Sequence, residues 1–90
     1  MIVSFITRVI SATGSKWFAK DIEIPFAPFI GMHLDDQKVE SVKVYSDKGW
    51  VACELESSEV GSRRCDWRSM EDAESTYLSS GWRLYRKTTP

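Results

Sequence analysis

The hydrophobic and polar positions of the first 24 residues predict a β-hairpin. Residues 2–11 and 16–24 are rich in β-branched and aromatic side chains, and Gly14 lies in the short turn between them. In the second of these strands Phe18 shares its parity with the later isoleucines, so we expect it to face the core. Trp17 has the opposite parity, which predicts a position at or near the surface.

An uncharged run follows at residues 24–32 and contains Pro25 and Pro28. Proline cannot donate a hydrogen bond to a sheet, so this run predicts a kink, an edge or a crossover between sheet segments. We expect a short strand to resume over residues 29–34. The polar residues 35–38 are then expected to end that strand in a loop.

The clearest local pattern is a second hairpin, formed by residues 39–45 and 50–56 around a loop that contains Gly49. A register that places Tyr45 opposite Trp50 brings the aliphatic residues of both strands onto one face. The same register places the two aromatic rings side by side on the other face.

The last third of the chain predicts a loop, a helix and a closing strand. Residues 57–68 are polar and charged, which is typical of a long surface loop. Ser69 fits a helix N-cap, because acidic residues follow it in the first turn of a helical pattern that Gly81 would end. A final strand is expected over residues 82–87.

This order of elements predicts an α+β fold, with a mostly antiparallel, curled sheet of about six strands and one helix near the C-terminus. The sheet is expected either to remain open around the helix or to form a partly open barrel. A chain of 90 residues is too short for two independent cores, so we expect residues 1–90 to form a single small globular domain.

Composition and charge restrict the cellular compartment that we expect for the protein and the kinds of partner that it can attract. The formal net charge is −1, so no global positive field attracts nucleic acid or anionic lipid. The apolar N-terminus is too short to span a bilayer and lacks the features of a secretion signal. Cys53 and Cys65 are expected to be reduced thiols. These features predict a cytoplasmic protein without a membrane partner.

Groups of residues that could perform catalysis or hold a metal are absent from the sequence. His33 is the only histidine, and there is no Cys-x-x-Cys pair and no glycine-rich phosphate loop. An enzyme that uses His33 with a thiol or a carboxylate is therefore the lowest-ranked hypothesis. We predict a protein that is not an enzyme and that has no cofactor and no metal.

The surplus of large aromatic rings leads to the first functional hypothesis. We expect a binding protein that acts by protein–protein contact, with itself as a homodimer or larger assembly, or with a larger partner. The expected contact residues are Trp17, Phe26, Phe29, Tyr45 and Trp50. Small accessory proteins of mobile elements are comparable in size and composition. In the alternative interpretation most of these rings are core: Phe26 and Phe29 plug the end of the core, and Tyr45 and Trp50 pack against the helix.

The second functional hypothesis is binding of single-stranded nucleic acid. Arg63, Arg64 and Arg68 surround Trp67, which combines guanidinium groups with a ring on which a base could stack. The neighbouring Asp66 and the acidic helical segment that follows oppose this interpretation. The alternative to nucleic-acid binding is that these arginines are ordinary solvated side chains on a surface loop.

Overall fold

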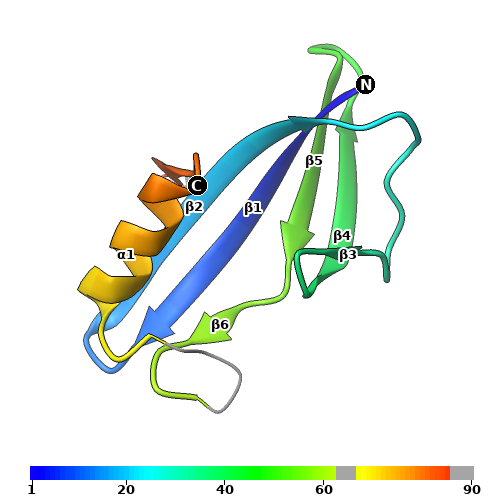
Figure 1. Ribbon diagram of the computed structural model, residues 1–90. Helices are drawn as coiled ribbons and strands as arrows, with labels where there is room; N and C mark the ends of the chain where they lie inside the picture. The colour runs from blue at the N-terminus through cyan, green and yellow to red at the C-terminus, as the bar shows by residue number, and fades with distance from the viewer. Residues whose placement is uncertain (63–66, 86–90) are drawn as a thin grey trace.

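The described residues form seven strands and one helix, and Figure 1 shows the strands as a curled sheet with the helix against one side. The computed structural model describes residues 1–62 and 67–85. The elements are β1 (Ile2–Ser11), β2 (Gly14–Glu23), β3 (His33–Leu34), β4 (Gln37–Tyr45), β5 (Trp50–Leu55), β6 (Ser58–Glu59), α1 (Met70–Ser79) and β7 (Arg83–Tyr85). The chain therefore forms a half-barrel that consists mostly of sheet, with a short helix near the C-terminus.

The sheet is mixed, because β1 pairs with strands of both directions. The strand order is β3-β4-β5-β1-β2-β7, and β6 lies off this path against β1. β1 pairs antiparallel with β2, but it pairs in parallel with β5 through Val3–Ile6 and with β6 through Val9–Ile10. The sequence patterns predicted the curled sheet and the helix. They did not predict the parallel pairs, because residues about fifty positions apart in the chain form them.

Both predicted hairpins form. In the second one Tyr45 lies opposite Trp50 and Val44 opposite Val51, as the hydrophobic pattern required. Gly49 closes the loop with a φ of 62°, a conformation that glycine adopts without steric cost. A register shift between Val39 and Ser41 marks a bulge in β4.

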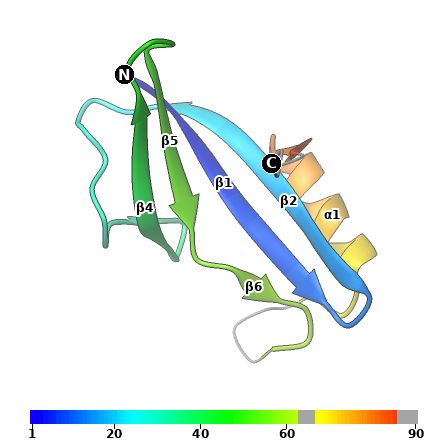
Figure 2. The same ribbon diagram turned by 180° about the vertical axis from the view of Figure 1, so that it is seen from behind.

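The prediction for residues 29–34 was wrong in extent, since only His33–Leu34 form a strand. The preceding residues 24–32, here named the proline segment, cross over the sheet instead (Figure 2). Backbone hydrogen bonds from Gly31 N–H to Val39 O and from Val39 N–H to Met32 O attach it to β4. With two prolines that cannot donate, the segment cannot form a longer ladder.

The loop predicted at residues 35–38 is also shorter than expected. Asp35 and Asp36 form a two-residue turn with φ values of 48° and 69°. Positive φ at both central positions is the geometry of a tight hairpin turn, which aspartate tolerates better than most residues. Gln37 and Lys38 therefore belong to β4, where they pair with Leu34 and His33.

The helix begins as predicted. Ser69 is its N-cap, and the Ser69 hydroxyl accepts a hydrogen bond from Asp72 N–H at 3.2 Å. Gly81 follows the helix with a φ of 90°. The predicted last strand is confirmed at Arg83–Tyr85, whereas Trp82 precedes it, and residues 86–87 lie outside the described residues.

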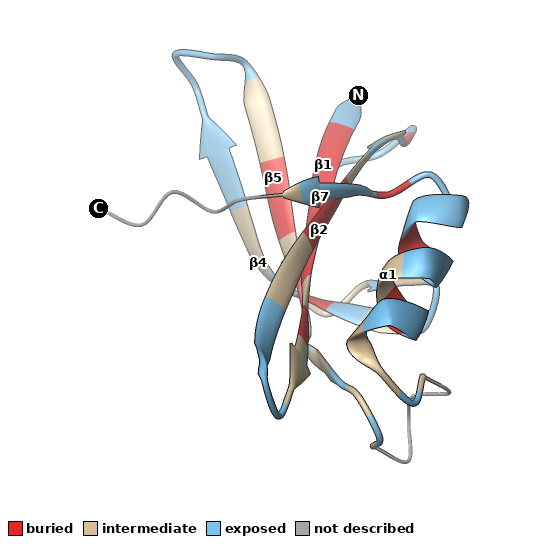
Figure 3. Cartoon of the chain, turned by 90° about the vertical axis from the view of Figure 1, so that its left-hand side faces the viewer, coloured by how far each residue is buried: buried red, intermediate tan, exposed pale blue. Residues whose placement is uncertain are grey.

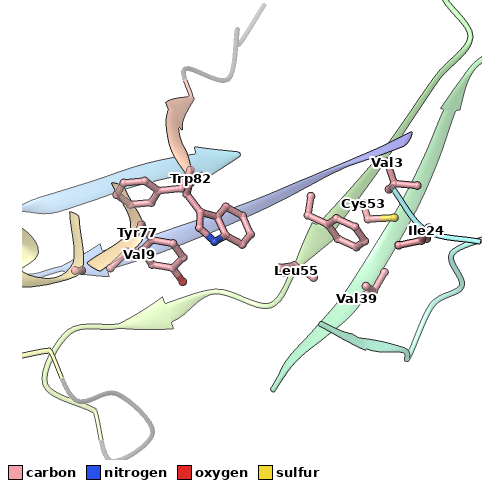
Figure 4. Packing of buried hydrophobic residues seen from close by; sticks show 11 residues of the cluster. Val3, Val9, Ile24, Val39, Cys53, Leu55, Tyr77 and Trp82 are labelled. Atoms are coloured by element: carbon pink, nitrogen blue, oxygen red, sulfur yellow. The ribbon is translucent and has the colours of Figure 1, made fainter. Parts of the chain in front are cut away.

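Two hydrophobic clusters hold the two faces of the sheet. The larger lies between the inner face and α1, whose buried positions face the sheet in Figure 3, and Figure 4 shows part of its packing around Tyr77 and Trp82. Phe18 is fully buried in this cluster, and its ring stacks on Tyr77 at 4.7 Å. The smaller lies on the outer face and consists of Ile6, Ala19 and Ala52. Phe18 was predicted to face the core, and its burial confirms this.

The predicted surface loop at residues 57–68 is partly regular. Ser58–Glu59 form β6, and Val60 N–H donates to Ile10 O at 2.9 Å. Residues 63–66 of this loop lie outside the described residues. A strand of two residues carries no alternating hydrophobic pattern of its own, so this element could not be predicted from the sequence.

Candidate functional site

The first candidate surface is the outer face of the sheet, opposite α1. Trp17 and Tyr85 lie opposite each other on β2 and β7, and Tyr45 lies opposite Trp50 on β4 and β5. Three of these rings, those of Trp17, Trp50 and Tyr85, pack against the small outer cluster. The predicted aromatic pair is present, with Tyr45 and Trp50 stacked at 4.8 Å.

Polar contacts fix the ring of Trp50. Its indole N–H donates to Ser4 Oγ at 2.6 Å, and the Ser4 hydroxyl donates to Asp21 Oδ1 at 2.6 Å. Arg83 forms an ion pair with the same carboxylate at 3.4 Å. Trp50 is half-buried as a result, whereas Tyr45 remains 37% exposed.

Trp17 lies on the same outer face, away from this pair. The guanidinium carbon of Arg8 stands 5.3 Å from its ring centroid, which is a cation–π arrangement. Trp17 is half-buried, in agreement with the prediction that it lies near the surface. The ring is therefore only partly available to a partner.

The second candidate surface is the proline segment. Ile24 is buried, and Met32 packs against the larger cluster, so both ends of the segment are anchored. Between these anchors Phe26 is 49% exposed, Phe29 is 59% exposed and Ile30 is 67% exposed. The fold thus leaves three large apolar side chains accessible on a backbone that is held at both ends.

The predicted nucleic-acid patch is only partly described. Arg63 and Arg64 lie outside the described residues. Trp67 is half-buried, with its ring centroid 5.2 Å from that of Tyr77, and Arg68 is exposed. Nucleic-acid binding by these four residues stays a prediction.

Cys53 is poorly suited to nucleophilic chemistry. Cys53 is fully buried, and burial raises the pKa of its thiol, so the nucleophilic thiolate is disfavoured. Cys65 lies outside the described residues. Within residues 1–62 and 67–85, groups of three or more His, Cys, Asp or Glu that could hold a metal ion are not found.

The sequence patterns gave no indication of a cleft on the inner side of the half-barrel. Its volume is about 1020 Å³, at the upper limit of what small-molecule sites have, and it lies between α1, the turn from β3 to β4 and the stretch from β5 to β6. Gln37 connects its walls: the amide group donates to Thr7 Oγ1 at 3.0 Å and accepts from the Tyr77 hydroxyl at 3.4 Å. Residues from distant parts of the chain form the cleft, so no local motif could have indicated it.

Comparison with known proteins gave no match, whether the chain was scanned against family models, curated proteins or solved structures. None of the helical structure in the described part of the chain has the length and apolar character needed to cross a bilayer.

Proposed function

We propose that this protein is a non-enzymatic binding protein that acts by protein–protein contact, with the proline segment as its main contact surface. One observation carries the proposal: Phe26, Phe29 and Ile30 remain 49%, 59% and 67% exposed on an anchored backbone. A preorganised apolar surface loses little conformational entropy when a partner covers it. Large rings of this kind are frequent among the residues that dominate binding energy.

Further apolar side chains extend this surface at the end of the half-barrel where the proline segment begins. Met1 lies there, since its amino group donates to Ile24 O at 3.1 Å. Figure 1 shows the N-terminus beside the hairpin of β4 and β5 at this end. Met1, Ile2 and Val44 are 55%, 63% and 68% exposed. The stacked pair of Tyr45 and Trp50 continues the surface onto the outer face, and Trp17 lies further along that face.

The partner that fits this surface best is a second copy of the chain. Fully burying a side chain such as Phe or Ile is worth about 1.5–3 kcal/mol, so each half-exposed side chain still offers about 1 kcal/mol. Together, the exposed apolar side chains must offset the free-energy cost of association, which is at least about 4 kcal/mol. A formal net charge of −1 adds little repulsion between two copies.

The test compares two double variants by sedimentation velocity over a range of protein concentrations. Phe26→Ser with Phe29→Ser removes two rings from the proposed surface. The matched control, Leu78→Ser with Leu84→Ser, removes two side chains that are 47% and 52% exposed on α1 and β7. We expect the wild type and the control to dimerise, and the Phe variant to have a dissociation constant raised by about tenfold or more.

A millimolar dissociation constant corresponds to a binding free energy of only about 4 kcal/mol. A wild-type protein that remains monomeric at about millimolar concentration would therefore refute self-association. Capture of a larger protein by the wild type and the control, but not by the Phe variant, would then assign the same surface to a different partner. Equal behaviour of all three proteins in both assays would refute the proposed surface.

A further inference from the structure

The cleft on the inner side of the half-barrel has an aromatic wall. The rings of Tyr77 and Trp82 meet at 5.3 Å with an interplanar angle of 85°, and Trp67 lies 5.2 Å from Tyr77 on the other side. Figure 4 shows Tyr77 and Trp82 next to each other, with Leu55 across from them. Their positions give the cleft an apolar, electron-rich wall.

The opposite wall is acidic. Asp35 and Asp36 lie in the turn from β3 to β4, and Glu56 and Glu59 lie in the stretch from β5 to β6. The only lysines among the described lining residues are Lys20 and Lys38, so the charged lining has an excess of negative charge. A cavity that is lined mainly by one sign of charge concentrates ions of the opposite sign.

The two walls are close to each other at Gln37. Its amide oxygen accepts from the Tyr77 hydroxyl at 3.4 Å, and Gln37 directly follows Asp36 in the chain. Asp36, Tyr77 and Trp82 all line the same cleft. A ligand of modest size can therefore contact the carboxylate of Asp36 and the aromatic rings at once.

Trp82 supplies an independent observation that points to a ligand. The residue lines the cleft and is only 8% exposed, and within the described part of the chain its indole N–H donates no hydrogen bond. The indole nitrogen is not among the buried polar atoms that lack a partner, so it is accessible from the cleft, where the acceptor of a ligand can reach it. Lys20 Nζ stands 6.0 Å from the Trp82 ring centroid, so this ring already has a cation over it in the free protein.

We propose that the cleft binds a small organic cation with an aromatic or apolar body and a hydrogen-bond acceptor. The ammonium group lies toward Asp35, Asp36 and the neighbouring glutamates. The aromatic or apolar body of the ligand lies against the rings of Tyr77 and Trp82. The acceptor of the ligand accepts a hydrogen bond from the indole N–H of Trp82. This site is separate from the proline segment, so it does not depend on the protein–protein contact proposed above.

The experiment follows the indole N–H signals of ¹⁵N-labelled protein by NMR during titration with benzoylcholine, which has a quaternary ammonium group, an ester carbonyl and a phenyl ring. We expect the signal of Trp82 to shift saturably and that of Trp17, on the outer face, to remain in place. Benzyltrimethylammonium lacks the carbonyl and should bind more weakly. Benzoate has the ring and an acceptor but a negative charge, and it should not bind.

Charge variants test the acidic wall. Asp35→Asn with Asp36→Asn removes two charges, and asparagine tolerates the positive φ of this turn, so the variant should fold. We expect this double variant to weaken benzoylcholine binding by about threefold or more, because the ammonium group loses its attraction to two nearby carboxylates. The matched control, Glu23→Gln with Glu40→Gln, removes two exposed charges from residues that do not line the cleft and should bind as the wild type does.

Three results would overturn the proposal. They are the absence of a saturable shift at Trp82, an equal response to benzoate, and equal affinities of the Asp35/Asp36 variant and the wild type.

Discussion

The side-chain amide of Gln37 makes hydrogen bonds to several segments inside the half-barrel. It donates to Thr7 Oγ1 at 3.0 Å and also reaches the backbone oxygen of Glu56 and Ser58 Oγ, each at 3.4 Å. Thr7 is fully buried on β1. The amide therefore joins β4, β1 and the stretch from β5 to β6. Its loss should weaken the fold even though Gln37 itself is only half-buried.

We predict that Gln37→Met, which keeps the side-chain length but removes the donor, destabilises the protein. Only the contact at 3.0 Å is a well-formed hydrogen bond, and its loss leaves the Thr7 hydroxyl with Glu56 O at 3.4 Å. A buried polar group that loses its partner costs about 1–3 kcal/mol. In a domain of this size each 1 kcal/mol lowers the unfolding midpoint by about 4–8 °C.

The double variant Thr7→Val with Gln37→Met provides the sharper test. Replacing both partners by apolar groups of similar shape leaves no unsatisfied hydroxyl at position 7, so the double change should cost less than the sum of the single changes. Urea unfolding followed by tryptophan fluorescence measures all three variants. Lys38→Met, at an exposed neighbouring position, is the control and should stay within about 0.5 kcal/mol of the wild type. A Gln37→Met variant as stable as that control, or strictly additive costs, would refute the reasoning.

Three further predictions concern single positions. Ser69→Ala should cost about 0.5–2 kcal/mol in thermal unfolding because the helix loses its N-cap, whereas Ser75→Ala, at an exposed site in the same helix, should not destabilise. Ser41→Val should leave the unfolding free energy unchanged or raise it by up to about 1 kcal/mol, because the buried Ser41 hydroxyl has no hydrogen-bond partner among the described residues; a clear loss would contradict this. Burial raises the pKa of the Cys53 thiol above its ordinary 9.0, so the stability that this thiol contributes is complete below that value and is lost as the pH rises through the raised pKa. The unfolding free energy of the wild type should therefore fall more steeply above about pH 9 than that of Cys53→Ala, and parallel curves would contradict the assignment.

The sequence predicted the parts of the fold that short-range chemistry determines. The loop with Gly49 and the alternation around it fix which residues of β4 and β5 face each other. Ser69 and Gly81 mark the helix ends, because capping depends on a few adjacent residues. Local patterns of this kind are present in the sequence before any tertiary contact forms.

The parts that could not be predicted depend on contacts between distant segments. The parallel pairing of β1 with β5 brings Val3 opposite Val51, and either strand could have paired elsewhere without violating its own pattern. Gln37 and Trp82 line the same cleft although they are far apart in the chain, and each has an ordinary local environment in the sequence. The exposure of the predicted contact rings also depends on tertiary packing. Phe26 and Phe29 are exposed, whereas Trp17 and Trp50 are half-buried by packing across the strands.

The position of β1 within the sheet affects the order in which the chain can fold during synthesis. β1 leaves the ribosome before the strands it pairs with and can form its hairpin with β2 early, but its other edge pairs, within the described residues, with β5 and β6. That edge of Val3 to Ile10 therefore stays unprotected until the chain beyond residue 59 has emerged. An open apolar strand edge is a site of aggregation. Slow translation of the residues between β2 and β5 would therefore increase the time during which the nascent chain can aggregate.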